Sequence, residues 1–276
     1  MKRIFTLAVA ICALTTSFGQ TDSTAKKTPD TIKIGGMVII REAGGQDSSR
    51  KKDRVFRITS RRGDKPANIS TNWWILDLGF SNWNDQTVYG PSTPADAFAP
   101  GSTDSWFQLR GGKSRNVNIW ILMQRVNMIK HVVNLKYGIG LELNNYFFED
   151  KSIRFNKNPT MIDQGFSGLK KNKLAADYLT IPVMLNFNFT PEKKRGYGLS
   201  AGISAGYLYS ARQKIKMDGE VDKTKGEFDL NNWKLSYVGE ISLGYVKLYG
   251  SYAFKSMFDK GLDLTPYNFG LRFSNW

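Results

Sequence analysis

The chain has almost no cysteine and almost no histidine. Its 276 residues include one cysteine, Cys12, and one histidine, His131. Cys12 lies in an amino-terminal segment that we expect to be removed, so the mature chain would lack disulfides, thiolate nucleophiles and cysteine-based metal sites. No Ser/His/acid constellation can be assembled around His131, and one histidine without cysteine argues against a transition-metal site. The sequence therefore predicts a protein that is not an enzyme and uses no cofactor.

Long hydrophobic runs are also absent beyond the first residues. No later segment approaches the ~18 consecutive apolar residues of a membrane-spanning helix. Lys2 and Arg3 precede the apolar run 4–14, and Ser17 and Gly19 occupy the −3 and −1 positions of a cleavage site. This pattern is typical of a secretory signal peptide, which we place at residues 1–19. Removing Lys2 and Arg3 lowers the formal charge from +15 to +13 (15 − 2).

Apolar residues that alternate with polar or small ones dominate the rest of the chain. The clearest case is Val133, Leu135, Tyr137, Ile139, Leu141 and Leu143. Side chains of a strand point alternately to opposite faces, so this segment is predicted to be a strand with one apolar face. The pattern recurs about eight times, and the connections are alternately long and short. A chain that crosses a membrane without helices can satisfy its backbone hydrogen bonds only as a closed barrel.

The predicted fold is all-β, an eight-stranded antiparallel up-and-down transmembrane β-barrel over residues 71–276. Long connections at 84–114, 149–176 and 213–231 would face outside, and short ones at 128–132, 190–195 and 244–245 would face the periplasm. An even strand number then places both termini in the periplasm. The expected location is the cell outer membrane.

The polar faces of the strands decide which side meets lipid. A cationic side chain at the bilayer midplane costs about 2–4 kcal/mol, so the charged face must point inward. The predicted interior network consists of Asp77, Lys136, Glu142, Lys234, Glu240, Lys247 and Arg272. We interpret it as a paired, hydrogen-bonded plug. A narrow charged conduit is the second interpretation, because the Gly and Ser residues of 198–206 would leave room. The alternative with the two faces reversed is a soluble lipocalin-type barrel, whose apolar side chains point inward.

The second strand is predicted at about 115–127, with an uninterrupted alternation. On this basis one set of residues faces lipid and another faces the interior. The lipid-facing set is Val117, Ile119, Ile121 and Met123, and the inward set is Asn116, Asn118 and Gln124.

The predicted outer loops are basic. For an exported barrel, lipopolysaccharide phosphates are a nearer anionic partner than nucleic acid, which we do not expect as a ligand. The candidate outer-leaflet lipid contacts are Arg110, Lys113, Lys151, Arg154, Lys157, Lys170, Lys171 and Lys173, with Arg115 beside the first two. Apolar residues of the second loop, such as Phe155, either form a contact patch or fold the loop onto the rim.

Residues 20–70 are predicted to be a basic, largely disordered periplasmic tail. Its composition is dominated by Lys, Arg, Asp, Ser and Gly, and one apolar island at 32–40 is compatible with a single strand. An envelope protein partner that docks on the tail or on the outer loops is the functional alternative.

One stretch carries a family resemblance. Residues 177–185, with Tyr178, Leu179, Ile181 and Pro182, resemble the Tyr-Leu-x-Ile-Pro strand of the porT-type outer-membrane β-barrel family of Bacteroidota. The end of the predicted signal peptide and the aromatic carboxyl-terminal residues also resemble that family. The resemblance implies an outer-membrane barrel, and the secretion role of one branch is not transferred.

The leading functional hypothesis is a non-enzymatic outer-membrane barrel with a structural or interaction role at the cell surface or in an envelope assembly. The alternatives are a narrow passive channel for small solutes and a lipid-binding or lipid-modifying barrel. His131 would be the only catalytic candidate for the last.

Overall fold

The computed structural model describes residues 30–34, 37–41, 67–157, 160–165, 168–193, 195–217 and 220–274. The chain divides into two compact units, Met1–Lys65 and Pro66–Trp276. In the first unit, β1 (Asp30–Ile34) pairs antiparallel with β2 (Met37–Arg41), where we expected a single strand. The predicted signal peptide and most of the predicted tail lie outside the described residues.

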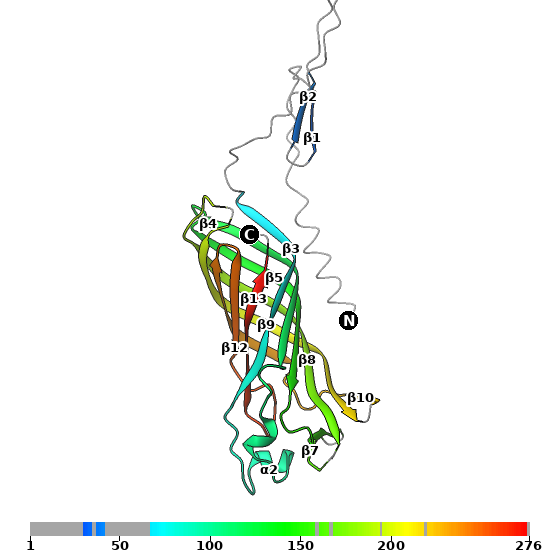
Figure 1. The fold of residues 1–276 in the computed structure, drawn as a ribbon. Helices are drawn as coiled ribbons and strands as arrows, with labels where there is room; N and C mark the ends of the chain where they lie inside the picture. The colour runs from blue at the N-terminus through cyan, green and yellow to red at the C-terminus, as the bar shows by residue number, and fades with distance from the viewer. Residues whose placement is uncertain are drawn as a thin grey trace, which may run out of the picture. The chain divides into compact units, whose positions relative to one another are not determined.

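The second unit is a closed barrel of eight antiparallel strands (Figure 1). In chain order they are β3 (Ile69–Asp85), β4 (Arg115–Ile129), β5 (Val133–Phe147), β8 (Leu169–Asn188), β9 (Tyr197–Met217), β11 (Trp233–Leu243), β12 (Val246–Ala253) and β13 (Leu264–Phe273). Each pairs with the next, and β13 pairs with β3 to close the ring. The prediction of an eight-stranded up-and-down barrel is confirmed.

The long connections carry the remaining elements, which gather at one end of the barrel (Figure 1). They are α2 (Pro94–Phe98), the 3₁₀-helix η1 (Asp104–Phe107), the pair β6 (Arg154–Phe155) and β7 (Ile162–Asp163), and β10 (Glu220–Lys225). Thr93 caps α2 by accepting a hydrogen bond from the backbone N–H of Asp96 at 3.2 Å. No helix among the described residues is long and apolar enough to cross a membrane.

Two segments predicted as loops are strands instead. β8 begins at Leu169 rather than near residue 177, and β9 continues to Met217, where it pairs with β10. The alternation is hidden in β8 because lysines occupy its outward positions. In β9 it is hidden by a bulge, since Tyr178 pairs with Leu208 but Asp177 with Ser210, which leaves Tyr209 as the extra residue.

A second irregularity corrects the predicted faces of β4. Trp120 pairs with Gly140 and Leu122 with Ile139, so Ile121 is a bulged residue. The extra residue reverses the alternation beyond it. Met123 is fully buried inside the barrel rather than facing lipid. Gln124 lies on the exposed face, where it accepts a hydrogen bond from the Tyr137 hydroxyl at 2.6 Å. Both assignments made from the sequence were therefore wrong.

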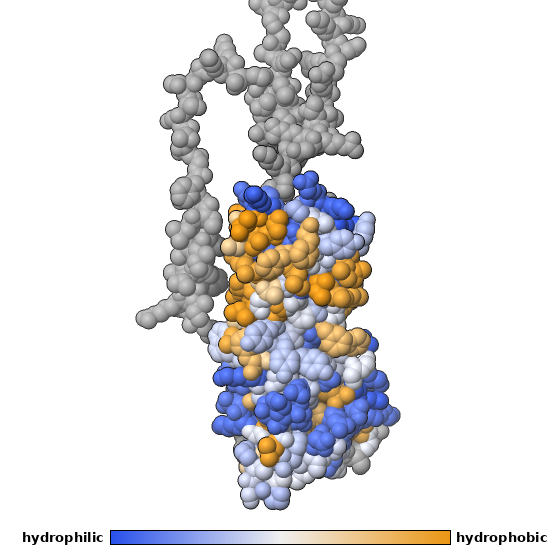
Figure 2. Space-filling model, turned by 90° about the vertical axis from the view of Figure 1, so that its left-hand side faces the viewer, coloured by the Kyte–Doolittle hydropathy of each residue, from blue (hydrophilic) through white to orange (hydrophobic). Residues whose placement is uncertain are grey.

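The outside of the barrel is apolar and the inside is polar. Large hydrophobic side chains on outward strand positions are exposed, and they form a band in the view of Figure 2, with hydrophilic residues at its two edges. Such an extensive exposed apolar surface is typical of membrane contact. The band includes Leu76, Leu78, Phe80, Leu179, Ile181, Val183, Leu199, Ile203, Leu235, Tyr237, Phe269 and Leu271. The soluble alternative with an apolar interior is contradicted.

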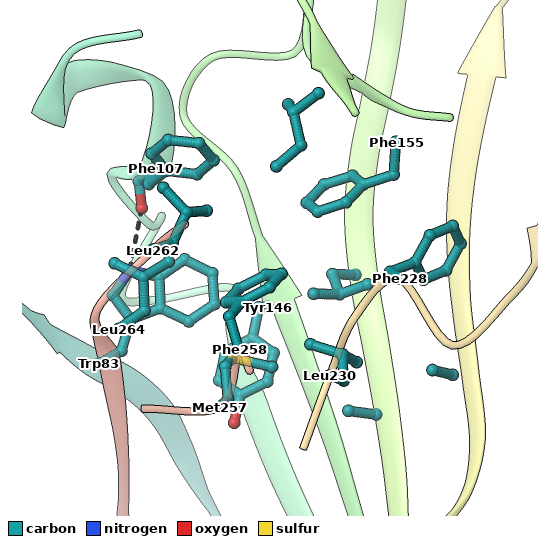
Figure 3. Packing of buried hydrophobic residues seen from close by; sticks show 14 of the residues in the cluster. Trp83, Phe107, Tyr146, Phe155, Phe228, Leu230, Met257, Phe258, Leu262 and Leu264 are labelled. Atoms are coloured by element: carbon teal, nitrogen blue, oxygen red, sulfur yellow. Dashed lines mark hydrogen bonds between the residues drawn. The ribbon is translucent and has the colours of Figure 1, made fainter. Parts of the chain in front are cut away.

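A separate hydrophobic core lies at the end that carries the long connections (Figure 3). The indole of Trp83 packs on Tyr146, with ring centroids 4.8 Å apart, and donates to the backbone carbonyl of Phe107 at 3.0 Å. Phe155, from the second connection, stacks on Phe258 from the last. The long connections thus fold together into a packed cap. Phe155 is buried in it and folds the second loop onto the rim, rather than forming an exposed contact patch.

Candidate functional site

The seven charged residues predicted for the interior are all buried. They project inward from five strands, with one residue each from β3, β12 and β13 and two each from β5 and β11. Four ion pairs connect them: Arg272 with Asp77 and with Glu240, Lys136 with Glu240, and Lys234 with Glu142. Lys247 donates to the Ser274 hydroxyl at 2.6 Å.

 Asp77 comes from β3, Lys136 and Glu142 from β5, Lys234 and Glu240 from β11, Lys247 from β12 and Arg272 from β13.

The centre of the network is the Arg272 guanidinium. Its Nε donates to Asp77 Oδ1 and its Nη2 to Asp77 Oδ2, both at 2.7 Å, and its Nη1 donates to Glu240. The planar fork of arginine matches a carboxylate in this two-bond geometry. Asp77 also accepts from the Trp120 indole at 2.7 Å and from the Asn118 amide at 3.1 Å. A single carboxylate therefore ties together three neighbouring strands.

The second acidic centre is Glu142. It accepts a hydrogen bond from Lys234, from the Asn144 amide at 3.1 Å, from the Asn268 amide at 3.0 Å and from the Thr180 hydroxyl at 3.3 Å. Burying a carboxylate is costly unless its lone pairs are satisfied. Four neighbouring donors meet that condition here.

Apolar side chains fill the space left by the interior glycines. Ile75, Trp120, Met123 and Met184 form a buried cluster inside the barrel. A Cβ placed on Gly140 would lie 2.7 Å from the Trp120 ring, and one on Gly138 would lie 2.8 Å from Met123 Cγ. The strand glycines thus admit these two side chains rather than leaving an open path.

A cationic pocket of about 510 Å³ lies on the outer surface of β4, β5 and β8, next to the cap. We call it the basic pocket. Of its twelve lining residues seven are cationic and none is acidic. The cations are Arg110, Lys113, Arg115, Lys151, Lys170, Lys171 and Lys173. The structure thus brings together six of the eight predicted lipid contacts.

The other two predicted contacts lie elsewhere. Arg154 pairs with Asp222 at 3.4 Å, and the Lys157 side chain lies beside Gly226. Sequence reasoning also missed cations that continue the basic surface across β9 and β10, because that region was predicted to be a loop. In the ladder Lys173 pairs with Lys214, which pairs with Lys223, and Lys171 pairs with Lys216.

Asp150 anchors the connection that borders the basic pocket. Its carboxylate accepts from the backbone N–H of Ser152 at 2.8 Å and from the Gln164 amide at 2.6 Å. Burial would raise the pKa of Asp150, but these hydrogen bonds and that of the Ser152 hydroxyl outweigh it. The pKa of the carboxyl is therefore held below its usual range.

His131 lies in the tight turn between β4 and β5, where Lys130 and His131 both have positive φ. Its backbone N–H donates to the Asn127 side chain at 2.7 Å. Among the described residues, no three His, Cys, Asp or Glu side chains are grouped so that they would hold a metal ion.

A comparison with protein families agrees with the fold. Residues 116–259 match the model of a family described as the outer membrane protein beta-barrel domain. No curated protein matches the chain. Among solved structures, the attachment invasion locus protein Ail of Yersinia pestis matches with 11% identity and a TM-score of 0.31, over 74% of this chain and 98% of that one. That similarity is too low to transfer any property.

Proposed function

The chain belongs to the outer membrane protein beta-barrel domain family, and from this premise we propose that it is a closed, non-enzymatic barrel that acts through its cap and outer surface. The observation that carries the proposal is the filled interior. Buried ion pairs between β5 and β11 cross the barrel, and Trp120 and Met123 occupy the space beside the interior glycines. An eight-stranded barrel is only wide enough for its own side chains.

The packed cap supports a structural or interaction role at the cell surface or in an envelope assembly. Long connections of a barrel usually face outside, and here they share one hydrophobic core. A rigid cap offers a preformed surface to a protein partner, because little conformational entropy is lost on binding. In this arrangement both ends of the barrel chain are periplasmic, on the side of the short turns.

Single-channel recording in planar bilayers tests closure. The wild-type protein is expected to give no steady current. The matched comparison is a Trp120→Gly/Met123→Gly variant, which removes the two side chains packed against Gly140 and Gly138 and is expected to conduct. A Leu122→Gly variant, altered on the outer face, is expected to stay closed. Steady wild-type currents would establish the alternative of a narrow solute channel.

A finer assignment is the porT-type branch of Bacteroidota. Its support is the stretch from Tyr178 to Pro182 in β8, in which Pro182 pairs with Ser204 of β9. On the side of β5, the ladder is interrupted between the Tyr137–Val183 and Gly140–Thr180 pairs, so the missing N–H of Pro182 is tolerated there. Finding the same proline at an interrupted ladder in porT-type barrels would support the assignment.

A further inference from the structure

We propose that the basic pocket binds the phosphate groups of an outer-leaflet lipid whose acyl chains lie on the apolar band below it. The chemistry of the lining argues for an anion, because seven cationic side chains converge and no lining residue is acidic. The proposal rests on the outer-membrane location and does not require a closed barrel.

The height of the pocket on the barrel argues for a lipid. Val117 lines its floor, and Arg115 is two residues further along β4. Further along the same strands toward the cap, Phe147 of β5 pairs with Lys173 of β8. At about 3.3 Å per residue, these cations lie within roughly 14 Å of Val117, at the depth where the polar headgroups meet the hydrocarbon core.

The apolar wall of the pocket continues the lipid-facing surface. Ile119, Leu141 and Leu179 form one outward row across β4, β5 and β8, and the pocket opens directly above it. The Phe147 ring lies inside the pocket, with Lys171 Nζ and Lys173 Nζ at 5.1 and 5.2 Å from its centroid. A ligand with both acyl chains and phosphates would contact the apolar row and the cationic pocket above it, whereas free phosphate would contact only the cationic pocket.

The ladder opposes like charges next to the pocket. Lys173 pairs with Lys214 and Lys171 with Lys216, and like charges directly opposite each other destabilise a sheet. Nearby acids are engaged elsewhere, Asp177 with Arg212 and Asp222 with Arg154. A bound polyanion would relieve this repulsion.

The test uses the full-length protein in dodecyl maltoside and fluorescent diphosphoryl lipid A as the probe. Lys171→Gln/Lys173→Gln is expected to weaken binding about tenfold, because charge-assisted hydrogen bonds to phosphate are lost. The matched control, Lys255→Gln/Lys260→Gln, removes two exposed charges at the same end of the barrel but outside the pocket, and is expected to change affinity less than about twofold. Lys171→Arg/Lys173→Arg is expected to retain binding.

Two further arms need no substitution. Diphosphoryl lipid A is expected to bind the wild-type protein more tightly than monophosphoryl lipid A, and 10 mM inorganic phosphate, an excess chosen for the assay, should not displace it. Equal affinity for the two lipids, or unchanged binding by the pocket variant, would overturn the proposal. Displacement by inorganic phosphate would instead identify a soluble phosphate ligand and refute the lipid. Channel recordings on the same samples test barrel closure independently, so a failure of lipid binding can be distinguished from a failure of the closed-barrel proposal.

Discussion

Replacing Glu240 by Gln tests whether the interior network holds the barrel together. The Glu240 carboxylate accepts from Lys136 Nζ at 2.7 and 2.6 Å and also pairs with Arg272, and its side chain is 1% exposed. Glutamine keeps the volume but removes the negative charge that balances two buried cations. Removing one partner of a buried ion pair costs about 3–5 kcal/mol. The unfolding equilibrium constant should therefore rise by a factor of about 10²–10⁴.

Urea titration of the protein in phospholipid vesicles, followed by tryptophan fluorescence, measures this change. Glu192→Gln is the matched control, because it makes the same chemical change at an exposed turn residue and should alter stability by less than about 0.5 kcal/mol. In a Lys136→Met/Glu240→Gln double variant, the loss should be smaller than the sum of the single losses. If Glu240→Gln is no more destabilising than Glu192→Gln, the network does not stabilise the barrel.

Three further predictions concern the band, the cap and the loop carboxylate. Ile203→Arg, in the middle of the exposed band, should cost about 2–4 kcal/mol and lower the folded fraction in vesicles, as seen by SDS mobility without boiling. Trp83→Ala should cost about 3–5 kcal/mol and make residues 86–114 sensitive to protease, because the ring and its bond to Phe107 are lost. Because the pKa of Asp150 is lowered on folding, its stabilising contribution is complete above the unfolded pKa of about 3.9 and disappears as pH falls through the folded pKa. The protection factor of the Ser152 amide against hydrogen exchange should therefore fall on acidification, and Asp150→Asn should abolish that dependence.

The period-two alternation, the alternately long and short connections and the cost of charge in lipid together predicted the barrel and its polar interior. Asp77, Glu142 and Arg272 were placed inside by their strand parity and by the cost of charge in lipid, and the structure has them buried. Their partners were not predictable, since pairing depends on how strands far apart in the sequence meet across the barrel.

The prediction of inward and outward faces from the sequence failed at the bulges. One extra residue in β4 moved Met123 inward and Gln124 outward, and in β3 Trp74 adopts a φ of 57° beside the same irregularity. A strict alternation has no means of signalling an inserted residue, because Ile121 and Leu122 are both apolar. The extension of β8 was missed for a different reason. Its outward positions carry lysines rather than apolar residues, as expected of a strand that continues beyond the hydrocarbon.

The bulge in β4 also links local backbone structure to the proposed function. Without it, Met123 would lie on the lipid face and would leave space beside Gly138. With it, the side chain enters the barrel and packs with Trp120, whose indole also donates to Asp77. Filling the interior in this way leaves the cap and the basic pocket as the large surfaces with distinctive chemistry in the described part of the barrel. Deleting Ile121 should leave a strict alternation in β4 in which Trp120 and Met123 both still point inward, so the barrel should remain closed. Steady single-channel currents from the deletion variant would contradict the claim that these two side chains close the barrel.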